Sequence, residues 1–484
     1  MCGIIGTISN GEVAADLYDG LLGLQHRGQD ACGMVTFFDN KFKVRKGTGL
    51  VREVFSMESL LELRGQIGIG HVRYPTAGAR AGEAEVQPFL LNSPYGLALA
   101  HNGNLTNADK LRQELEKKDY YFNSSSDSEV LLTLLADELR SKAKKTLKNE
   151  PIFAAVAEVM QKAQGSYSVV VLIANFGLLA FRDPAGIRPL IFCERATGFA
   201  KESLIASEPS AATLLGYDNF KDVEAGEAIL IDLKGNLEKK QLAKAQHTPC
   251  IFEYVYLARP DSVLDKLSVY KARLRMGEKL AKQILKSELE IDVVVPVPDS
   301  STTAAITLAY NLGIKYREGL VKNRYIGRTF IMPGQEIRKK SIRHKLTSVD
   351  LELKGKKVLL VDDSIVRGNT SARIVEMVRK AGAEKVYFAS AAPPLKWPCF
   401  YGVDFPTRAE LVAAYRSLDE IKKELGVDAL FYQTLEDLKA ACGEGRTDLN
   451  PHLKGFCAAC FDGNYPLGKI DVEAMEKEGK QCGI

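Results

Sequence analysis

The sequence predicts a protein of at least two domains, of which the second is an α/β domain with a parallel sheet. A chain of 484 residues, 46 % of them hydrophobic, exceeds what a single core usually organises. The second half alternates short apolar runs with helical patterns, as βαβ units do. A lysine-rich, poorly patterned stretch, 234–246, separates the halves. We therefore predict domains over residues 2–240 and 241–484.

The motif VLLVDDSIVRGNTS, residues 358–371, has the clearest chemistry in the chain. Its unbroken apolar run indicates a strand buried on both faces of a parallel sheet. A helical pattern follows over 371–380. A helix start offers unpaired N–H groups and a positive dipole end, and Gly368 lets a phosphate approach the backbone closely. This motif predicts a phosphate site in which Asp362 and Asp363 hold a ribose diol or a pyrophosphate-bound Mg²⁺.

An ordinary strand-to-helix turn with Asp caps is the alternative. It does not explain why the strand, the acid pair and the Gly/Thr loop coincide. The motif resembles the phosphoribosyl-pyrophosphate (PRPP) signature of the type I phosphoribosyltransferases, which implies that fold for the second half. The resemblance also implies PRPP contacts at Asp362, Asp363, Ser364, Val366, Arg367, Gly368, Asn369 and Thr370.

A second polar cluster, Asp299 to Ser301, ends the apolar run of DVVVPVPDSS. Ligands of such sheets bind at the carboxyl ends of the strands. If the two strands are neighbours, Ser300 is a candidate contact for Mg²⁺ or pyrophosphate beside Asp362 and Asp363. A helix N-cap explains Ser300 equally well.

The chain begins MCGIIG, so removal of Met1 would leave Cys2 with a free α-amine on the residue that carries the thiol. An α-amine has a pKa of about 8, which suits a base that takes the thiol proton. The resulting thiolate is a strong nucleophile. We expect Cys2 to be a catalytic nucleophile; a buried cysteine without a chemical role is the alternative.

Further motifs follow within the first 240 residues: LQHRGQDACG (24–33), GHVRYPTAG (70–78), HNGNL (101–105) and SSSDSE (124–129). Together with MCGI they resemble, in the same order, the class II glutamine amidotransferases. That resemblance implies an α+β N-terminal-nucleophile fold in which two antiparallel sheets stack between helices.

The same resemblance assigns roles to residues of these motifs. Asn102 and Gly103 would donate oxyanion-hole hydrogen bonds when Cys2 attacks glutamine. Arg73 and Asp127 would hold the α-carboxylate and α-amine of glutamine, which suits the charge of each side chain. His26, His71 and His101 occur in the same motifs, and we expect them to support loops.

The basic and aromatic segment KNRYIGRTFI, 322–331, has no firm helical pattern. A solvated charged loop is the plain interpretation. The segment is also similar to the flexible loop that folds over PRPP in the glutamine PRPP amidotransferases, a family that nearly the whole chain resembles, EYVYLARPDS (253–262) included. This implies that Lys322, Arg324, Tyr325 and Arg328 belong to a loop that closes on PRPP and couples the two sites.

The family resemblance implies a reaction and partners. Glutamine is hydrolysed, and its ammonia is channelled to PRPP, giving 5-phosphoribosylamine, pyrophosphate and glutamate in the first committed step of purine synthesis. It further implies a homo-oligomer, either a homotetramer or a dimer with the tetramer favoured, and feedback inhibition by the purine nucleotides AMP, GMP, ADP and GDP.

Four of the nine cysteines suggest a metal site: Cys250, Cys399, Cys457 and Cys460. One C-x-x-C pair with two distant cysteines fits either Zn²⁺ or an iron–sulfur cluster, and spacing does not choose between them. In a cluster-bearing branch of the family, cysteines in similar contexts bind a 4Fe–4S cluster, which the resemblance therefore implies here. We expect no ligand role for Cys32, Cys193, Cys442 or Cys482.

The composition and the motifs argue against several other classes of protein. A formal net charge of +4 with 26 % charged residues requires neither nucleic acid nor an anionic membrane as partner. No apolar run approaches the roughly 18 residues of a membrane span, and no secretory pattern is present, so we expect a cytoplasmic protein. A purine-responsive repressor would need a DNA-binding domain, for which we find no signature. Other glutamine amidotransferases would share only the first half.

Overall fold

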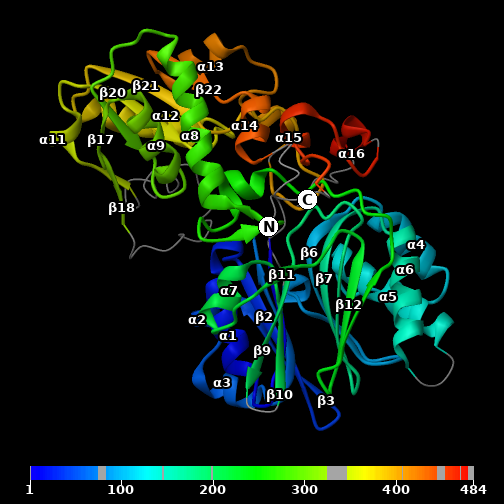
Figure 1. The fold of residues 1–484 in the computed structure, drawn as a ribbon. Helices are drawn as coiled ribbons and strands as arrows, with labels where there is room; N and C mark the ends of the chain where they lie inside the picture. Colours follow the sequence, from blue (N-terminus) through cyan, green and yellow to red (C-terminus); the bar gives the residue numbers. More distant parts are fainter. Residues whose placement is uncertain are drawn as a thin grey trace.

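The structure is a computed structural model that describes residues 2–74, 83–143, 147–197, 200–323, 346–405, 407–443, 453–468 and 470–477. It has two lobes (Figure 1). The N-terminal lobe contains two antiparallel sheets, and the C-terminal lobe contains a parallel sheet. Both predicted fold classes are confirmed. None of the helices in the described ranges is long and apolar enough to cross a membrane.

The first sheet of the N-terminal lobe has seven strands. In spatial order they are β11 (Lys221–Asp222), β9 (Ile191–Thr197), β10 (Ala200–Ala206), β1 (Gly3–Ile8), β4 (Ile67–Arg73), β2 (Ala31–Phe38) and β3 (Lys41–Thr48). Its outer face packs on helices α1 (Ala14–Gly23), α2 (Val51–Val54), α3 (Met57–Glu62) and α7 (Pro209–Leu214). The strand β1 is central in this sheet.

The second sheet has six strands. Their order is β13 (Leu237–Gln241), β12 (Glu227–Asp232), β8 (Gly177–Arg182), β7 (Gly165–Ile173), β6 (Leu97–Leu105) and β5 (Phe89–Leu91). Helices α4 (Ala108–Glu116), α5 (Asp127–Lys142) and α6 (Asn149–Lys162) cover its outer face. β13 lies inside the lysine-rich stretch that showed no pattern, because an edge strand with a partly exposed surface needs no apolar alternation.

The two antiparallel sheets face each other across a shared core. Ile4, Ile69, Val170 and Ile205 belong to it, whereas Ile5 points to the helices on the other face of β1. Because successive side chains of a strand point to opposite faces, a strand between two apolar layers must be apolar throughout. This explains why GIIGTI shows no alternation.

The C-terminal lobe has a five-stranded sheet in which every pair of neighbours is parallel. The order is β17 (Lys315–Tyr316), β16 (Val293–Pro296), β20 (Lys357–Asp362), β21 (Lys385–Ser390) and β22 (Ala429–Tyr432). Helices α8 (Val269–Leu285) and α9 (Thr302–Leu312) cover one face, and α12 (Asn369–Lys380) and α13 (Leu418–Leu425) cover the other. β16 and β20 are neighbours, so the condition set for a role of Ser300 beside the acid pair is met.

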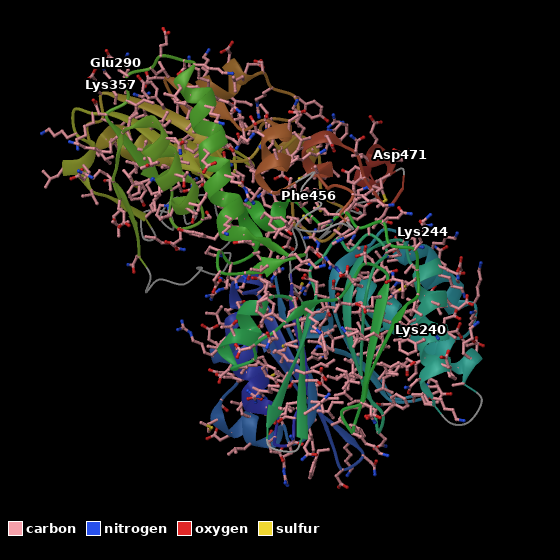
Figure 2. The ribbon with its side chains drawn as sticks, viewed as in Figure 1. Lys240, Lys244, Glu290, Lys357, Phe456 and Asp471 are labelled. Atoms are coloured by element: carbon pink, nitrogen blue, oxygen red, sulfur yellow. The ribbon has the colours of Figure 1, made fainter. Side chains whose placement is uncertain are left out.

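The other elements of the described residues are shorter. They are η1 (Gln25–Arg27), η2 (Glu83–Glu85), η3 (Glu253–Leu257), β14 (Val263–Leu264), β15 (Leu267–Ser268), β18 (Leu320–Lys322), β19 (Leu346–Ser348), α11 (Asp350–Leu353), η4 (Arg408–Glu410), α14 (Leu435–Ala441), α15 (Ala459–Asp462) and α16 (Val472–Lys477). One buried cluster joins Ala185 and Ile187 of the N-terminal lobe to Cys250, Cys399 and Phe456. Figure 2 labels Phe456 at this junction of the lobes.

Candidate active site

Cys2 lies at the start of one antiparallel sheet and contacts the other. It directly precedes β1 and is half-buried. Its main-chain nitrogen donates to Asn102 Oδ1 at 3.3 Å, and Asn102 comes from β6 of the opposite sheet. The fold thus joins two motifs that are a hundred residues apart in the chain.

The side-chain amide of Asn102 has a free donor. Its Nδ2 atom is buried and has no hydrogen-bond partner in the described structure. Buried donors are nearly always paired, so an unpaired one beside a thiol is a place where an oxyanion can bind. The next residue, Gly103, has no space for a side chain, because a Cβ there would lie 2.0 Å from the carbonyl oxygen of Ser166.

The residues predicted to bind the two ends of glutamine lie at the ends of elements. Arg73 is the last residue of β4, and its Nη1 atom is buried without a partner in the part of the chain described. Gly28 packs on its backbone, where a Cβ would approach the Arg73 carbonyl carbon to 2.5 Å. Asp127 begins α5, and its Oδ2 accepts a hydrogen bond from the main-chain N–H of Leu105 at 2.9 Å. Its carboxylate remains 21 % exposed.

The three histidines of these motifs lie in different surroundings. His101 is buried, with Nδ1 3.0 Å from Ser128 Oγ. His26 Nε2 lies 2.8 Å from Glu208 Oε1. Burial, reinforced by the nearby charge of Arg73, lowers the pKa of His71 to about 3, so this ring is neutral at working pH.

The acid pair of the second motif lies at the carboxyl end of β20, as predicted. Ser300, beyond the end of the neighbouring β16, donates its hydroxyl hydrogen bond to Asp363 Oδ2. Ser301, and not Ser300, is the N-cap residue of α9. Burial raises the pKa of both Asp362 and Asp363, and repulsion from Asp363 raises that of Asp362 further. A cation at this position would relieve that repulsion.

The loop after the acid pair leads into a helix two residues earlier than the sequence predicted. α12 begins at Asn369, with Gly368 at its N-cap in the left-handed conformation, φ +78°. The main-chain oxygen of Val366 accepts a hydrogen bond from Val412 N–H at 2.9 Å, which anchors the middle of the loop. A left-handed glycine directly before a helix N-terminus is a backbone arrangement that suits an anion, as the motif implied.

Only one of the four predicted loop residues lies within the described ranges. Lys322 ends β18, and its Nζ is 2.8 Å from Asp299 Oδ2 at the rim of the acid-pair site. Arg324, Tyr325 and Arg328 lie outside the described residues.

The four cysteines of the predicted metal site belong to the buried cluster at the junction of the lobes. Cys250 and Cys457 form a parallel bridge. Burial and the charges of the other three thiols raise the pKa of Cys460 well above its ordinary value. Among the described residues, no group of three or more His, Cys, Asp or Glu side chains is arranged to hold a metal ion. The four cysteines therefore share one buried cluster, but within the described residues they are not arranged as metal ligands.

A buried arginine beside these thiols was missed by sequence reasoning. Burial disfavours its charge, yet attraction to Glu253 and to the thiolate forms of Cys250, Cys399 and Cys457 raises the pKa of Arg188 above its ordinary value. This fits a donor set that becomes anionic when it binds metal, since a fixed positive charge compensates the thiolates. Nothing local in AGIRPL distinguishes such a residue from a surface arginine.

The remaining cysteines have ordinary environments where they are described. Burial raises the pKa of Cys32 and of Cys193 to about 12. Their thiols face the main-chain oxygens of Gly49 and Leu204 at 3.8 and 3.7 Å. Cys442 packs in the junction cluster. Cys482 lies outside the described residues.

Comparison with known proteins agrees with both halves of the chain. Residues 77–213 match the model of a glutamine amidotransferase domain, and residues 265–395 match that of a phosphoribosyl transferase domain. The amidophosphoribosyltransferase of Pseudomonas aeruginosa is 52 % identical over 481 residues, which cover 99 % of this chain and 95 % of the relative. That of Escherichia coli is 49 % identical over 477 residues, covering 97 % and 94 %.

Solved structures agree as well. The glutamine PRPP amidotransferase of B. subtilis, complexed with ADP and GMP, superposes with a TM-score of 0.84 at 39 % identity, covering 96 % of this chain and 97 % of that one. Similarity of sequence and structure therefore extends over both lobes. The chain belongs to the amidophosphoribosyltransferase family.

Proposed function

We propose that this protein converts glutamine, water and PRPP into glutamate, 5-phosphoribosylamine and pyrophosphate. One observation carries the proposal: a single chain holds a cysteine beside an unpartnered buried amide in one lobe and a buried acid pair before a helix N-terminus in the other. The full-length similarity to amidophosphoribosyltransferases supports it.

In the N-terminal lobe, the thiolate of Cys2 attacks the side-chain amide of glutamine, with its own α-amine as the base. The developing oxyanion accepts hydrogen bonds from Asn102 Nδ2 and from the main-chain N–H of Gly103. Arg73 and Asp127 hold the two charged groups of the substrate. Ammonia leaves, and water hydrolyses the glutamyl thioester to glutamate.

In the C-terminal lobe, residues 362–370 bind the ribose and phosphate groups of PRPP. Their backbone N–H groups at the start of α12 hold the 5′-phosphate. Mg²⁺, when held by Asp362, Asp363 and Ser300, would neutralise the pyrophosphate leaving group. Ammonia then attacks C1 of the ribose, and the C1–O bond to pyrophosphate breaks.

The test is glutamine- and PRPP-dependent formation of glutamate and pyrophosphate by purified protein. Cys2→Ser should abolish the use of glutamine and retain synthesis from added ammonia, because only the first half-reaction needs the thiol. Cys193→Ala, which changes a buried cysteine outside both sites, serves as the control and should retain both activities. Glutamine-dependent activity in the Cys2→Ser protein would refute the assignment.

We also propose that Cys250, Cys399, Cys457 and Cys460 hold a 4Fe–4S cluster. The four-thiol donor set and the compensating charge of Arg188 support this, and both also suit Zn²⁺. Anaerobically purified protein should be brown, with stoichiometric iron and sulfide, and Cys457→Ser should lose both. Cys442→Ala, a neighbour in the same buried cluster, should retain them. Colourless protein that contains one zinc ion per chain would favour a zinc site over the cluster.

Regulation and assembly form a separate proposal. Because the B. subtilis enzyme was solved with ADP and GMP, we propose that AMP, GMP, ADP and GDP inhibit this protein, and that it forms the homotetramer expected from its family. Inhibition assays at varied PRPP concentration and light scattering test the two statements. Lack of inhibition, or a monomer at working concentration, would contradict them.

A further inference from the structure

A segment of the C-terminal lobe, Cys399–Gly402, lies directly against the strand that carries the proposed oxyanion donors. Asn104 Nδ2 donates to the main-chain oxygen of Phe400 at 3.1 Å. Ser166 Oγ donates to the main-chain oxygen of Tyr401 at 2.8 Å. The backbones also touch, since a Cβ on Gly402 would lie 3.1 Å from the carbonyl carbon of Gly103.

This contact supports the end of β6 on a side where the sheet has no neighbouring strand among those described. Residues Asn102 to Asn104 pair with Ser166 to Ser168 of β7. On the other side, β5 reaches only as far as Leu99 of β6. Among the described strands, the end of β6 therefore has a neighbour on one side only. A strand end with a single neighbour frays more readily than one held on both sides.

The supporting segment is itself firmly held. Phe400 and Tyr401 are buried. The main-chain N–H of Tyr401 donates to Cys399 Sγ at 3.3 Å, and its carbonyl accepts a second hydrogen bond from Arg188 Nε at 2.7 Å. Tyr465 donates its hydroxyl to the Pro398 carbonyl at 2.8 Å. Contacts from both lobes thus fix the segment.

We infer that Asn104 and Ser166 are positioning residues for glutamine hydrolysis, which fasten the end of β6 to the main chain of Phe400 and Tyr401. The inference rests on the proposed oxyanion role of Asn102 and Gly103. An oxyanion hole works only when its donors are held in place before the reaction, and a displacement of about 1 Å can cost about 100-fold in rate. Neither positioning residue touches the substrate.

Three variants test the inference. Asn104→Asp keeps the shape of the side chain and removes the amide donor to Phe400. Ser166→Ala removes the second donor, while Arg188 still satisfies the Tyr401 carbonyl. The matched control is Asn107→Asp. It removes an equivalent hydrogen bond, which Asn107 Nδ2 donates to the Lys162 carbonyl at 2.9 Å, away from the segment.

We expect kcat for glutamine hydrolysis to fall by about 10- to 100-fold in Asn104→Asp and Ser166→Ala. The KM for glutamine and ammonia-dependent synthesis should remain unchanged, because the ends of glutamine and PRPP are bound elsewhere. Iodoacetamide should alkylate Cys2 at the parent rate, as followed by mass spectrometry, and iron and sulfide contents should match the parent. Asn107→Asp should behave as the parent in each assay.

Three outcomes would overturn the inference: an unchanged kcat in both variants, an equal loss in Asn107→Asp, or a parallel loss of ammonia-dependent synthesis. The proposed function is tested separately, because its failure would show as glutamine use by Cys2→Ser. If the parent hydrolyses glutamine through Cys2 and both variants retain its kcat, the positioning inference is wrong and the proposed function stands.

Discussion

At the scale of single residues, the first site depends on one amide donor without a partner. Asn102 accepts a hydrogen bond from the Cys2 nitrogen through its oxygen, and its buried Nδ2 donates to nothing in the described structure. Leaving a buried donor unpaired costs about 1–3 kcal/mol. Such a cost is tolerated where a group that forms during the reaction will use the donor.

Asn102→Ala should therefore lower kcat for glutamine by about 100- to 1,000-fold, because the tetrahedral intermediate loses a donor. Steady-state kinetics with glutamine and with ammonia measure the effect, and the ammonia reaction should keep its rate. A loss shared by both reactions, or a change of less than about twofold with glutamine, would contradict the oxyanion role.

At the scale of elements, helix α12 depends on the backbone conformation of the residue before it. Gly368 has φ +78°, and a Cβ there would lie 3.3 Å from the side chain of Val412, which is tighter than most Cβ contacts, and 3.4 Å from that of Leu425. An alanine would therefore require a small shift of the Val412 side chain. The left-handed conformation by itself costs a residue with a Cβ roughly 1–2 kcal/mol. If the backbone shifts to relieve that strain, the main-chain N–H groups at the start of α12 move with it.

Gly368→Ala should lose roughly 1–2 kcal/mol of stability and also weaken PRPP binding. Gly426→Ala is the control: it has φ +70°, ends α13 and has open space around its Cβ position. It should lose similar stability without weaker binding. Urea unfolding and calorimetric titration with PRPP and Mg²⁺ separate the two effects. Equal PRPP affinities in both variants would show that Gly368 does not shape the phosphate site.

At the scale of the whole molecule, buried charges connect the lobes. Arg27 of η1 contacts Glu208 and lies 2.8 Å from Glu253, which begins η3. Arg188 reaches Glu253 as well, at 3.2 Å. Removing one partner of such a network leaves an uncompensated buried charge, which typically costs 3–5 kcal/mol.

Glu208→Gln should lower the free energy of unfolding by about 3–5 kcal/mol at neutral pH. Burial by itself would raise the pKa of Glu208, but Arg27 and His26 hold it well below its ordinary value. A depressed folded-state pKa contributes stability above the unfolded pKa of about 4.3, which is lost as pH falls toward the folded value. The parent should therefore approach the variant in stability below about pH 4.

Urea unfolding at several pH values measures both effects. Glu150→Gln is the control, because Glu150 pairs with Lys240 on the surface, where Figure 2 labels the lysine. That exposed pair should contribute less than about 1 kcal/mol. A difference between parent and Glu208→Gln that stays constant from pH 7 to pH 3 would refute the linkage.

The sequence by itself determined the features that depend on residues close together in the chain. The apolar run before Asp362, the following polar loop and the helical pattern are local, because strand and helix periods repeat within a few residues. The order of β16, α9, β20 and α12 followed from the same patterns. The exact start of α12 did not, because it depends on the left-handed conformation of Gly368.

Only the tertiary structure decided which distant residues meet. The contact of Asn104 with Phe400 joins residues 296 positions apart, and that of Ser166 with Tyr401 joins residues 235 apart. The place of Arg188 among the thiols, and the free donor of Asn102, depend on packing between lobes and between sheets. No local pattern encodes such contacts, because burial and hydrogen-bond partners are properties of the assembled core.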